Sequence, residues 1–111
     1  GAGWLTIEEV KWKLNGELTT HSPSTYKIPA VNDMPEQLIV KNFRNLNKEN
    51  VVNKSKTTGE PPLMLGMSVF FAIKDAISST RNYQVIPNLN APATPEAILL
   101  SINDIKKKYE K

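Results

Sequence analysis

Hydrophobic residues surround one predicted helix in the middle of the chain. Between residues 63 and 73 the apolar positions leave no polar stripe over roughly three helical turns. Pro61 and Pro62 suit the start of this helix, because a proline in the first turn sacrifices no helical hydrogen bond. Lys74 and Asp75 then restore polar positions. The pattern predicts a helix that is buried on every side until its last turns.

A second helix is predicted at the end of the chain, where the apolar positions form a single stripe. Thr94 can cap this helix, Pro95 suits its first position, and Glu96 places a negative charge in its first turn. The stripe at helical spacing consists of Ile98, Leu99, Ile102, Ile105 and Tyr109. We therefore expect an amphipathic helix that docks on the body of the protein through one side.

A β-hairpin is predicted near the N-terminus. Apolar residues change phase between residues 5–7 and 10–14, which indicates that a helix ends near Glu8 and a strand follows. The pair Asn15-Gly16 can adopt the positive φ angles of a tight turn, and residues 17–20 would return as the partner strand.

Further β-structure is predicted before and after the central helix. Residues 37–43 form the best strand by length and β-branched content, and shorter strands are expected around residues 51–52 and at an edge over residues 84–87. The predicted fold class is α+β: a small sheet of hairpin plus central strand, packed with one buried helix and the C-terminal amphipathic helix. At 111 residues, the chain is long enough for one domain with a modest core, so residues 1–111 are treated as a single piece.

Residues 21–29 predict an ordered, mostly extended connector, because they hold two prolines and several hydroxyl side chains. We expect Tyr26 to be a packing residue whose hydroxyl has a hydrogen-bond partner. His21 has the chemistry of a proton shuttle, but an exposed loop histidine is the simpler interpretation.

Composition narrows the classes of function. The chain has no cysteine, which excludes disulfides, thiolate metal sites and iron–sulfur ligands, and its only histidine argues against a metal centre. The longest apolar run is shorter than the roughly 20 residues that cross a bilayer, so we expect no membrane partner and a cytoplasmic protein. The net charge of +3 comes from scattered lysines and a lysine-rich end that suits a helix C-terminus.

A non-catalytic binding module is the alternative function, with RNA bound to a basic surface. Such a surface needs clustered arginines and lysines with aromatic residues between them. Only Arg44 and Arg81 are arginines, and Trp4 and Trp12 have no basic residues interleaved with them on a clear period. We therefore expect no nucleic-acid partner.

The candidate catalytic group is Glu60. Pro61 biases this residue away from helical geometry, so a carboxylate is expected just outside the N-terminus of the central helix. A carboxylate fixed there and partly withdrawn from water suits proton transfer. Because glycines and glutamates are also common in ordinary helix entries, the residues alone leave a plain helix-entry loop as the competing interpretation.

The segment Gly59-Glu60-Pro61-Pro62-Leu63, with Ser68-Val69-Phe70-Phe71-Ala72-Ile73-Lys74-Asp75-Ala76-Ile77 behind it, resembles the end of the molybdenum-binding region of xanthine dehydrogenases and aldehyde oxidases. Other segments fall in the same order, so the resemblance covers nearly the whole chain. They are Ser24-Thr25-Tyr26-Lys27-Ile28-Pro29, Ser55-Lys56 and Ala93-Thr94-Pro95-Glu96.

The resemblance implies roles for three neighbouring residues. In that family the glutamate of Gly-Glu-Pro-Pro is the general base during insertion of water-derived oxygen at an electron-poor carbon, which makes Glu60 the catalytic residue. Thr58 and Gly59 are implied as the turn that lies against the cofactor. Lys54, Thr57 and Thr58 depart from the family pattern and imply a more polar lining there.

The resemblance also implies a larger parent enzyme. This chain would be the C-terminal portion of a molybdopterin-binding domain, truncated at its N-terminus, in a homodimeric enzyme that oxidises purines or aldehydes. The parent would hold a molybdopterin–molybdenum cofactor together with FAD and a 2Fe-2S cluster in regions absent here. The remainder of the parent polypeptide is then the main partner, and the isolated chain is expected to be inactive and to bind no cofactor.

Overall fold

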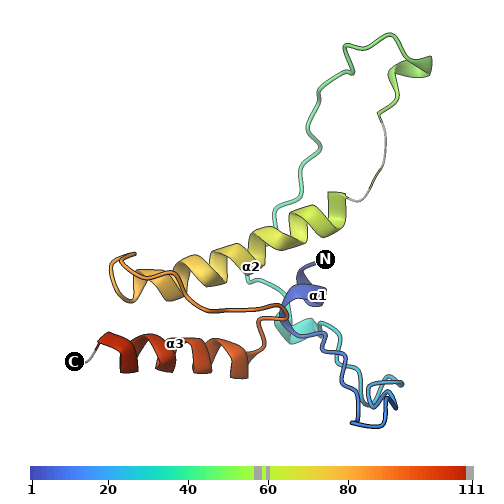
Figure 1. The fold of residues 1–111 in the computed structure, drawn as a ribbon. Coiled ribbons are helices and arrows are strands. Elements are labelled where there is room, and N and C mark those ends of the chain that lie inside the picture. The colour runs from blue at the N-terminus through green and yellow to red at the C-terminus, as the bar shows by residue number, and fades with distance from the viewer. Residues whose placement is uncertain (57–58, 60, 110–111) are drawn as a thin grey trace.

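The computed structural model describes residues 1–56, 59 and 61–109, and its regular elements are helices. They are the α-helices α1 (Ala2–Thr6), α2 (Pro61–Ser79) and α3 (Pro95–Tyr109) and the short 3₁₀-helices η1 (Val31–Asp33) and η2 (Val52–Lys54). Figure 1 shows that α2 and α3 run in roughly the same direction, because the connector between them runs back along the molecule before α3 begins.

Helix α2 buries one side only, so the prediction of burial all round is wrong. The better-covered side repeats at helical spacing and consists of Leu63, Gly66, Met67, Phe70, Ile73 and Ile77. On the other side Met64, Leu65 and Phe71 are 57–69% exposed. The reason is supply, because the described chain brings covering segments to only one side of this helix. None of the helices in the described ranges is long and apolar enough to cross a membrane.

Helix α3 begins where its sequence predicted. The backbone N–H of Ala97 donates to Thr94 Oγ1 at 3.2 Å, which is the N-cap hydrogen bond, and α3 starts at Pro95 with Glu96 in its first turn. Of the predicted stripe, Ile105 is buried and Ile98 and Ile102 pack against the core, whereas Leu99 stays exposed. The prediction of one-sided docking is confirmed.

A small core lies where α2, the connector and α3 meet. Its buried residues are Ile77 from α2, Leu89 and Ala93 from the connector, and Ile105 from α3. The Ser78 hydroxyl donates to the Val85 carbonyl at 2.6 Å, which holds the returning connector against the end of α2. Burial of these apolar side chains is the main driving force for packing α3 against the rest.

The predicted α+β fold class is wrong, because the described residues form no strand or sheet. Residues 37–43 and 84–87 are without regular structure, and η2 occupies the position of the strand expected around residues 51–52. A strand is stable only when a neighbour pairs with its backbone, and the described part of the chain places no neighbour beside these segments.

The hairpin is present only as its turn. Gly16 has the positive φ of +83°, and the Lys13 N–H donates to the Glu17 carbonyl at 2.9 Å. An isolated antiparallel bridge pairs Trp12 with Leu18. A lone hairpin is marginal in water, so a correct turn sequence yields one bridge rather than a ladder.

Residues 35–56 form an arm that extends away from the helices and carries η2 near its far end (Figure 1). Its apolar side chains are exposed, with Val40 at 81% and Phe43 at 87%. The radius of gyration is 18.9 Å, against about 13 Å for a compact domain of this length. The arm therefore has no internal packing partner.

Helix α1 crosses α2 at a glycine. A Cβ placed on Gly66 would lie 2.5 Å from the backbone of Gly1, so only glycine permits this close approach. The Ala93 N–H donates to the Leu5 carbonyl at 2.7 Å, which ties the connector to α1 as well. The N-terminal segment is thus anchored both to α2 and to the start of α3.

Candidate functional site

The predicted catalytic turn lies between the end of the arm and α2. Of its residues, Gly59 is described, whereas Thr58 and Glu60 lie outside the described residues, as does Thr57. Because α2 begins at Pro61, the residue before the helix in sequence is Glu60. The positive end of the α2 dipole favours an anionic group at this position.

Gly59 is open to its surroundings. It is exposed, and a Cβ built on it would meet no heavy atom within 4 Å. Another molecule or another part of a larger protein can therefore approach its backbone closely. This open side fits a group that the turn touches without enclosing, so a cofactor placed here would need further walls from elsewhere.

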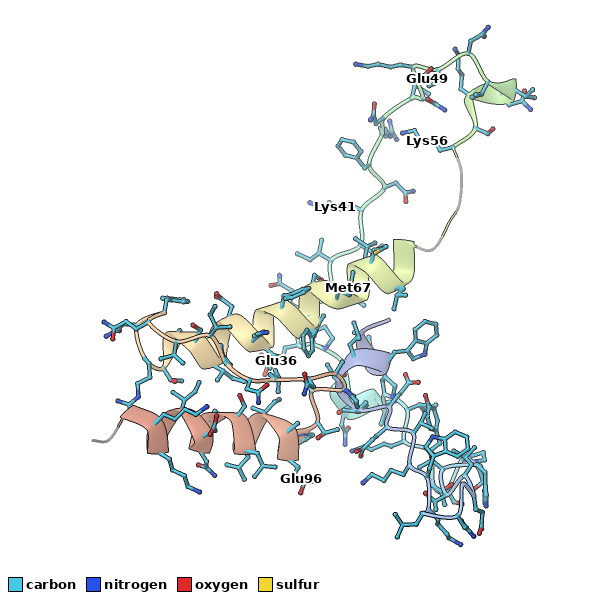
Figure 2. The ribbon with its side chains drawn as sticks, in the orientation of Figure 1. Glu36, Lys41, Glu49, Lys56, Met67 and Glu96 are labelled. Atoms are coloured by element: carbon cyan, nitrogen blue, oxygen red, sulfur yellow. The ribbon has the colours of Figure 1, made fainter. Side chains whose placement is uncertain are left out.

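Two hydrogen bonds hold the arm together before the turn. The Lys56 ammonium donates to the Asn45 carbonyl at 2.8 Å, and the Asn47 side-chain amide donates to the Ser55 carbonyl at 2.7 Å. They join the outgoing and returning stretches of the arm, on which Figure 2 labels Lys41, Glu49 and Lys56. The approach to the turn is therefore a closed loop rather than a free strand.

Lys54 takes part in the same loop. Its ammonium donates to the Glu49 carbonyl at 3.2 Å, and its side chain is exposed. This contact is local to the far end of the arm, and in this structure the charge of Lys54 serves the loop itself.

Tyr26 has the satisfied hydroxyl that was predicted. It donates to Glu8 Oε2 at 2.6 Å across a partly buried contact, which ties the connector to the residues after α1. This hydrogen bond, then burial and the nearby Glu8 charge, raise the pKa of Tyr26 above its ordinary value. The sequence gave no signal for the partner, because Glu8 stood only as a helix end.

The remaining chemistry-bearing side chains do not gather around Gly59. His21 is exposed. In the described ranges no group of three or more His, Cys, Asp or Glu residues is placed to hold a metal ion.

Sequence reasoning missed a cavity of about 450 Å³ beside the first half of α3. Its walls come from α3, from residues 88–92 of the connector, and from Glu9. The available signal was the spacing of Glu96 and Asp104, which places both carboxylates along one ridge of a helix.

Comparison with known proteins identifies relatives of the whole chain. A family model for the molybdopterin cofactor-binding domain matches residues 1–35. Xanthine dehydrogenase of Oryza sativa subsp. japonica is 41% identical over 98% of this chain and 9% of its own length. Xanthine dehydrogenase 2 of Arabidopsis thaliana is 41% identical over 94% of the chain and 8% of its own length, and xanthine dehydrogenase/oxidase of Rattus norvegicus is 44% identical over 88% and 8%.

These matches agree with the family that the Gly-Glu-Pro-Pro segment resembles, and the chain spans only 8–9% of the length of the relatives described. A short piece of each relative therefore corresponds to nearly all of this chain. The chain belongs to the xanthine dehydrogenase and aldehyde oxidase family, within its molybdenum-cofactor-binding region.

Proposed function

We propose that this chain is the C-terminal portion of the molybdopterin-binding domain of a molybdenum hydroxylase, and that Glu60 is the general base of the parent enzyme. The observation that carries the proposal is the identity of 41–44% to xanthine dehydrogenases over most of the chain. The position of Gly59-Glu60 immediately before α2 and the open side of Gly59 support it.

The role of Glu60 in this proposal is to accept a proton. A general base must be ionised at the working pH and must lie within hydrogen-bond reach of the proton that it takes. The N-terminal end of α2 favours the ionised carboxylate, and the two prolines after it restrict the backbone of the turn. Thr58 and Gly59 would form the turn against the cofactor, where Gly59 permits the closest approach.

The molybdenum cofactor, when bound, supplies the redox chemistry of the substrate carbon. The described residues leave Gly59 exposed and do not enclose it, so the remainder of the parent polypeptide must supply the other walls. We therefore infer that the isolated 111-residue chain has no hydroxylase activity and retains no molybdenum. Elemental analysis of the purified chain measures this directly, and stoichiometric molybdenum would contradict it.

The parent in this proposal is a homodimer that acts on a purine or an aldehyde and also carries FAD and a 2Fe-2S cluster in other regions. Residues outside this chain would select the substrate. The exposed side of α2 supports the larger assembly, since apolar side chains there expect protein on both sides of the helix.

The proposal is tested by Glu60→Gln in the full-length parent enzyme. Glutamine keeps the volume and the hydrogen-bonding capacity but cannot accept the proton, so turnover per bound molybdenum should fall by roughly 10²–10⁴-fold with cofactor content unchanged. Glu60→Ala should lose at least as much. Steady-state rates normalised to molybdenum measure the effect.

Glu36→Gln is the matched control, because Glu36 is an exposed carboxylate near the start of the arm. It should keep the parent rate. If Glu60 only stabilises the helix entry, Glu60→Gln should behave like this control and cost about 0.3–1 kcal/mol of stability. A retained rate above about a tenth of the parent value would remove Glu60 from the role of base.

A further inference from the structure

The cavity beside α3 is lined by charged residues of one sign only. Its charged side chains are Glu9, Glu96 and Asp104, and no lysine or arginine lines it. Glu96 lies at the start of α3, where Figure 2 labels it, and it makes no ion pair within the described part of the chain. The cavity therefore favours a cationic occupant.

Ser101 adds an independent sign of a missing partner. This residue lines the same cavity and is only 4% exposed, and its hydroxyl has no hydrogen-bond partner among the described residues. Buried hydroxyls are nearly always hydrogen-bonded, because leaving one without a partner costs free energy. An occupant that donates a hydrogen bond would satisfy it.

The walls of the cavity are held in place by contacts already described. Glu96 and Asp104 follow one ridge of α3, and Ser101 lies one turn before Asp104. The opposite wall, residues 88–92, is fixed at its end by the Ala93 N–H bond to the Leu5 carbonyl at 2.7 Å. Three separate stretches of the sequence therefore meet at this cavity.

The carboxylates have little competition for an incoming cation. Glu9 pairs with Lys11 at 3.0 Å and Asp104 pairs with Lys108 at 2.7 Å, and both pairs have side chains that are 42–60% exposed. Exposed pairs of this kind are weak and can exchange partners. The carboxylates do not meet the placement needed to hold a metal ion, whereas about 450 Å³ accommodates a small organic group.

We propose that this cavity is a binding site for an organic cation, an ammonium or guanidinium group. The group pairs with Glu96 and Asp104 and donates a hydrogen bond to the Ser101 hydroxyl. Such a group comes either from a free amine or from a lysine or arginine side chain of the remainder of the parent polypeptide. The second source rests on the proposed function, whereas the site itself depends neither on molybdenum nor on Glu60.

The first experiment titrates the 111-residue chain with butylguanidinium chloride and follows its amide signals by NMR. We expect saturable shifts at the amides of Ala97 and Ser101. Butylurea has nearly the same shape without the charge, and it should bind at least about fivefold more weakly. Equal shifts from the two compounds, or no saturation, would overturn the proposal.

Two variants and one control locate the site. Glu96→Gln should weaken butylguanidinium binding by about three- to tenfold. Ser101→Ala should weaken binding too, while it raises the Tm of the unliganded chain by removing an unsatisfied hydroxyl. Glu49→Gln makes the same change at the far end of the arm, well away from Glu96 in Figure 2, and should bind as the parent does. A Ser101→Ala chain of higher Tm and unchanged affinity would show that the hydroxyl only packs, and would overturn the site.

The same titration in the full-length parent separates the two sources. Saturable binding of butylguanidinium there identifies a free amine as the occupant. If the parent does not bind it, a basic side chain of the parent predicts that Glu96→Gln lowers the Tm of the full-length protein and that Glu49→Gln does not. No binding and no Tm change in Glu96→Gln would contradict the proposal, whatever the outcome of the Glu60 experiment.

Discussion

The α2–connector–α3 unit and the arm of residues 35–56 contain similar apolar side chains and use them differently. In the first, Ile77, Leu89 and Ile105 are 2–4% exposed and touch one another across three segments. In the arm, Ile39 is 64% and Val40 is 81% exposed. The difference shows that apolar sequence becomes packed only where a second segment reaches it. The arm requires a partner that the described chain does not contain.

The largest effect is expected from a change in the packed unit. Ile105→Ala should lower the free energy of unfolding by about 2–5 kcal/mol, because it leaves a cavity at the centre of the core. Ile39→Ala, the same change on the arm, should stay within about 0.5 kcal/mol. Urea denaturation followed by circular dichroism measures both. Equal losses would end the contrast between the two regions.

A smaller effect is expected at the start of α3. Thr94→Ala removes the N-cap acceptor and should cost about 1 kcal/mol, whereas Thr94→Ser keeps the hydroxyl and should cost much less. The unfolding midpoints of the two variants give the comparison. A serine variant as unstable as the alanine variant would mean that the methyl group, not the cap, matters.

The contact between Tyr26 and Glu8 should appear as a dependence of stability on pH. The pKa of Tyr26 is raised in the folded protein, so its contribution is fully present below pH about 10, the ordinary tyrosine value, and is lost as the pH rises through the folded pKa. Tyr26→Phe should remove this alkaline decline. Tyr83→Phe, at an exposed tyrosine, should leave it unchanged. Thermal melts between pH 8 and 11 test the pair.

The smallest effect is expected in the hairpin turn. Lys13 and Glu17 form an ion pair at 2.9 Å with both side chains 54% exposed, so Glu17→Gln should cost less than about 0.5 kcal/mol. Any loss should vanish in 1 M salt, where screening is strong. A loss above about 1 kcal/mol would show that the turn is packed more firmly than its exposure indicates.

Local features were predictable from the sequence, and features that need a distant partner were not. The cap at Thr94 and the positive φ at Gly16 depend on a few neighbouring residues, and both are present. Residues 37–43 have strand-like composition but no segment to pair with. The apolar circumference of α2 indicated what the helix can pack against, not how much of that packing this chain supplies.

The candidate site divides in the same way. Gly59 is found where the helix entry was predicted, at the mouth of α2, and the roles of Thr58 and Glu60 stay predictions. The acidic cavity was not foreseen, because its walls join Glu9, residues 88–92 and the first half of α3. Only Glu96, Ser101 and Asp104 are close in sequence, and a helical spacing alone does not reveal a cavity.

The hydrogen bond from the Ala93 N–H to the Leu5 carbonyl also bears on the order in which the molecule assembles. Its two ends are separated by most of the chain, so closing this loop carries a larger entropic cost than joining α2 to α3 through their connector. Contacts of long sequence separation form slowly. We therefore expect the α2–α3 unit to form first and α1 to dock last. In pulsed hydrogen exchange during refolding, the amide of Ala93 should gain protection later than the amides in the middle of α3.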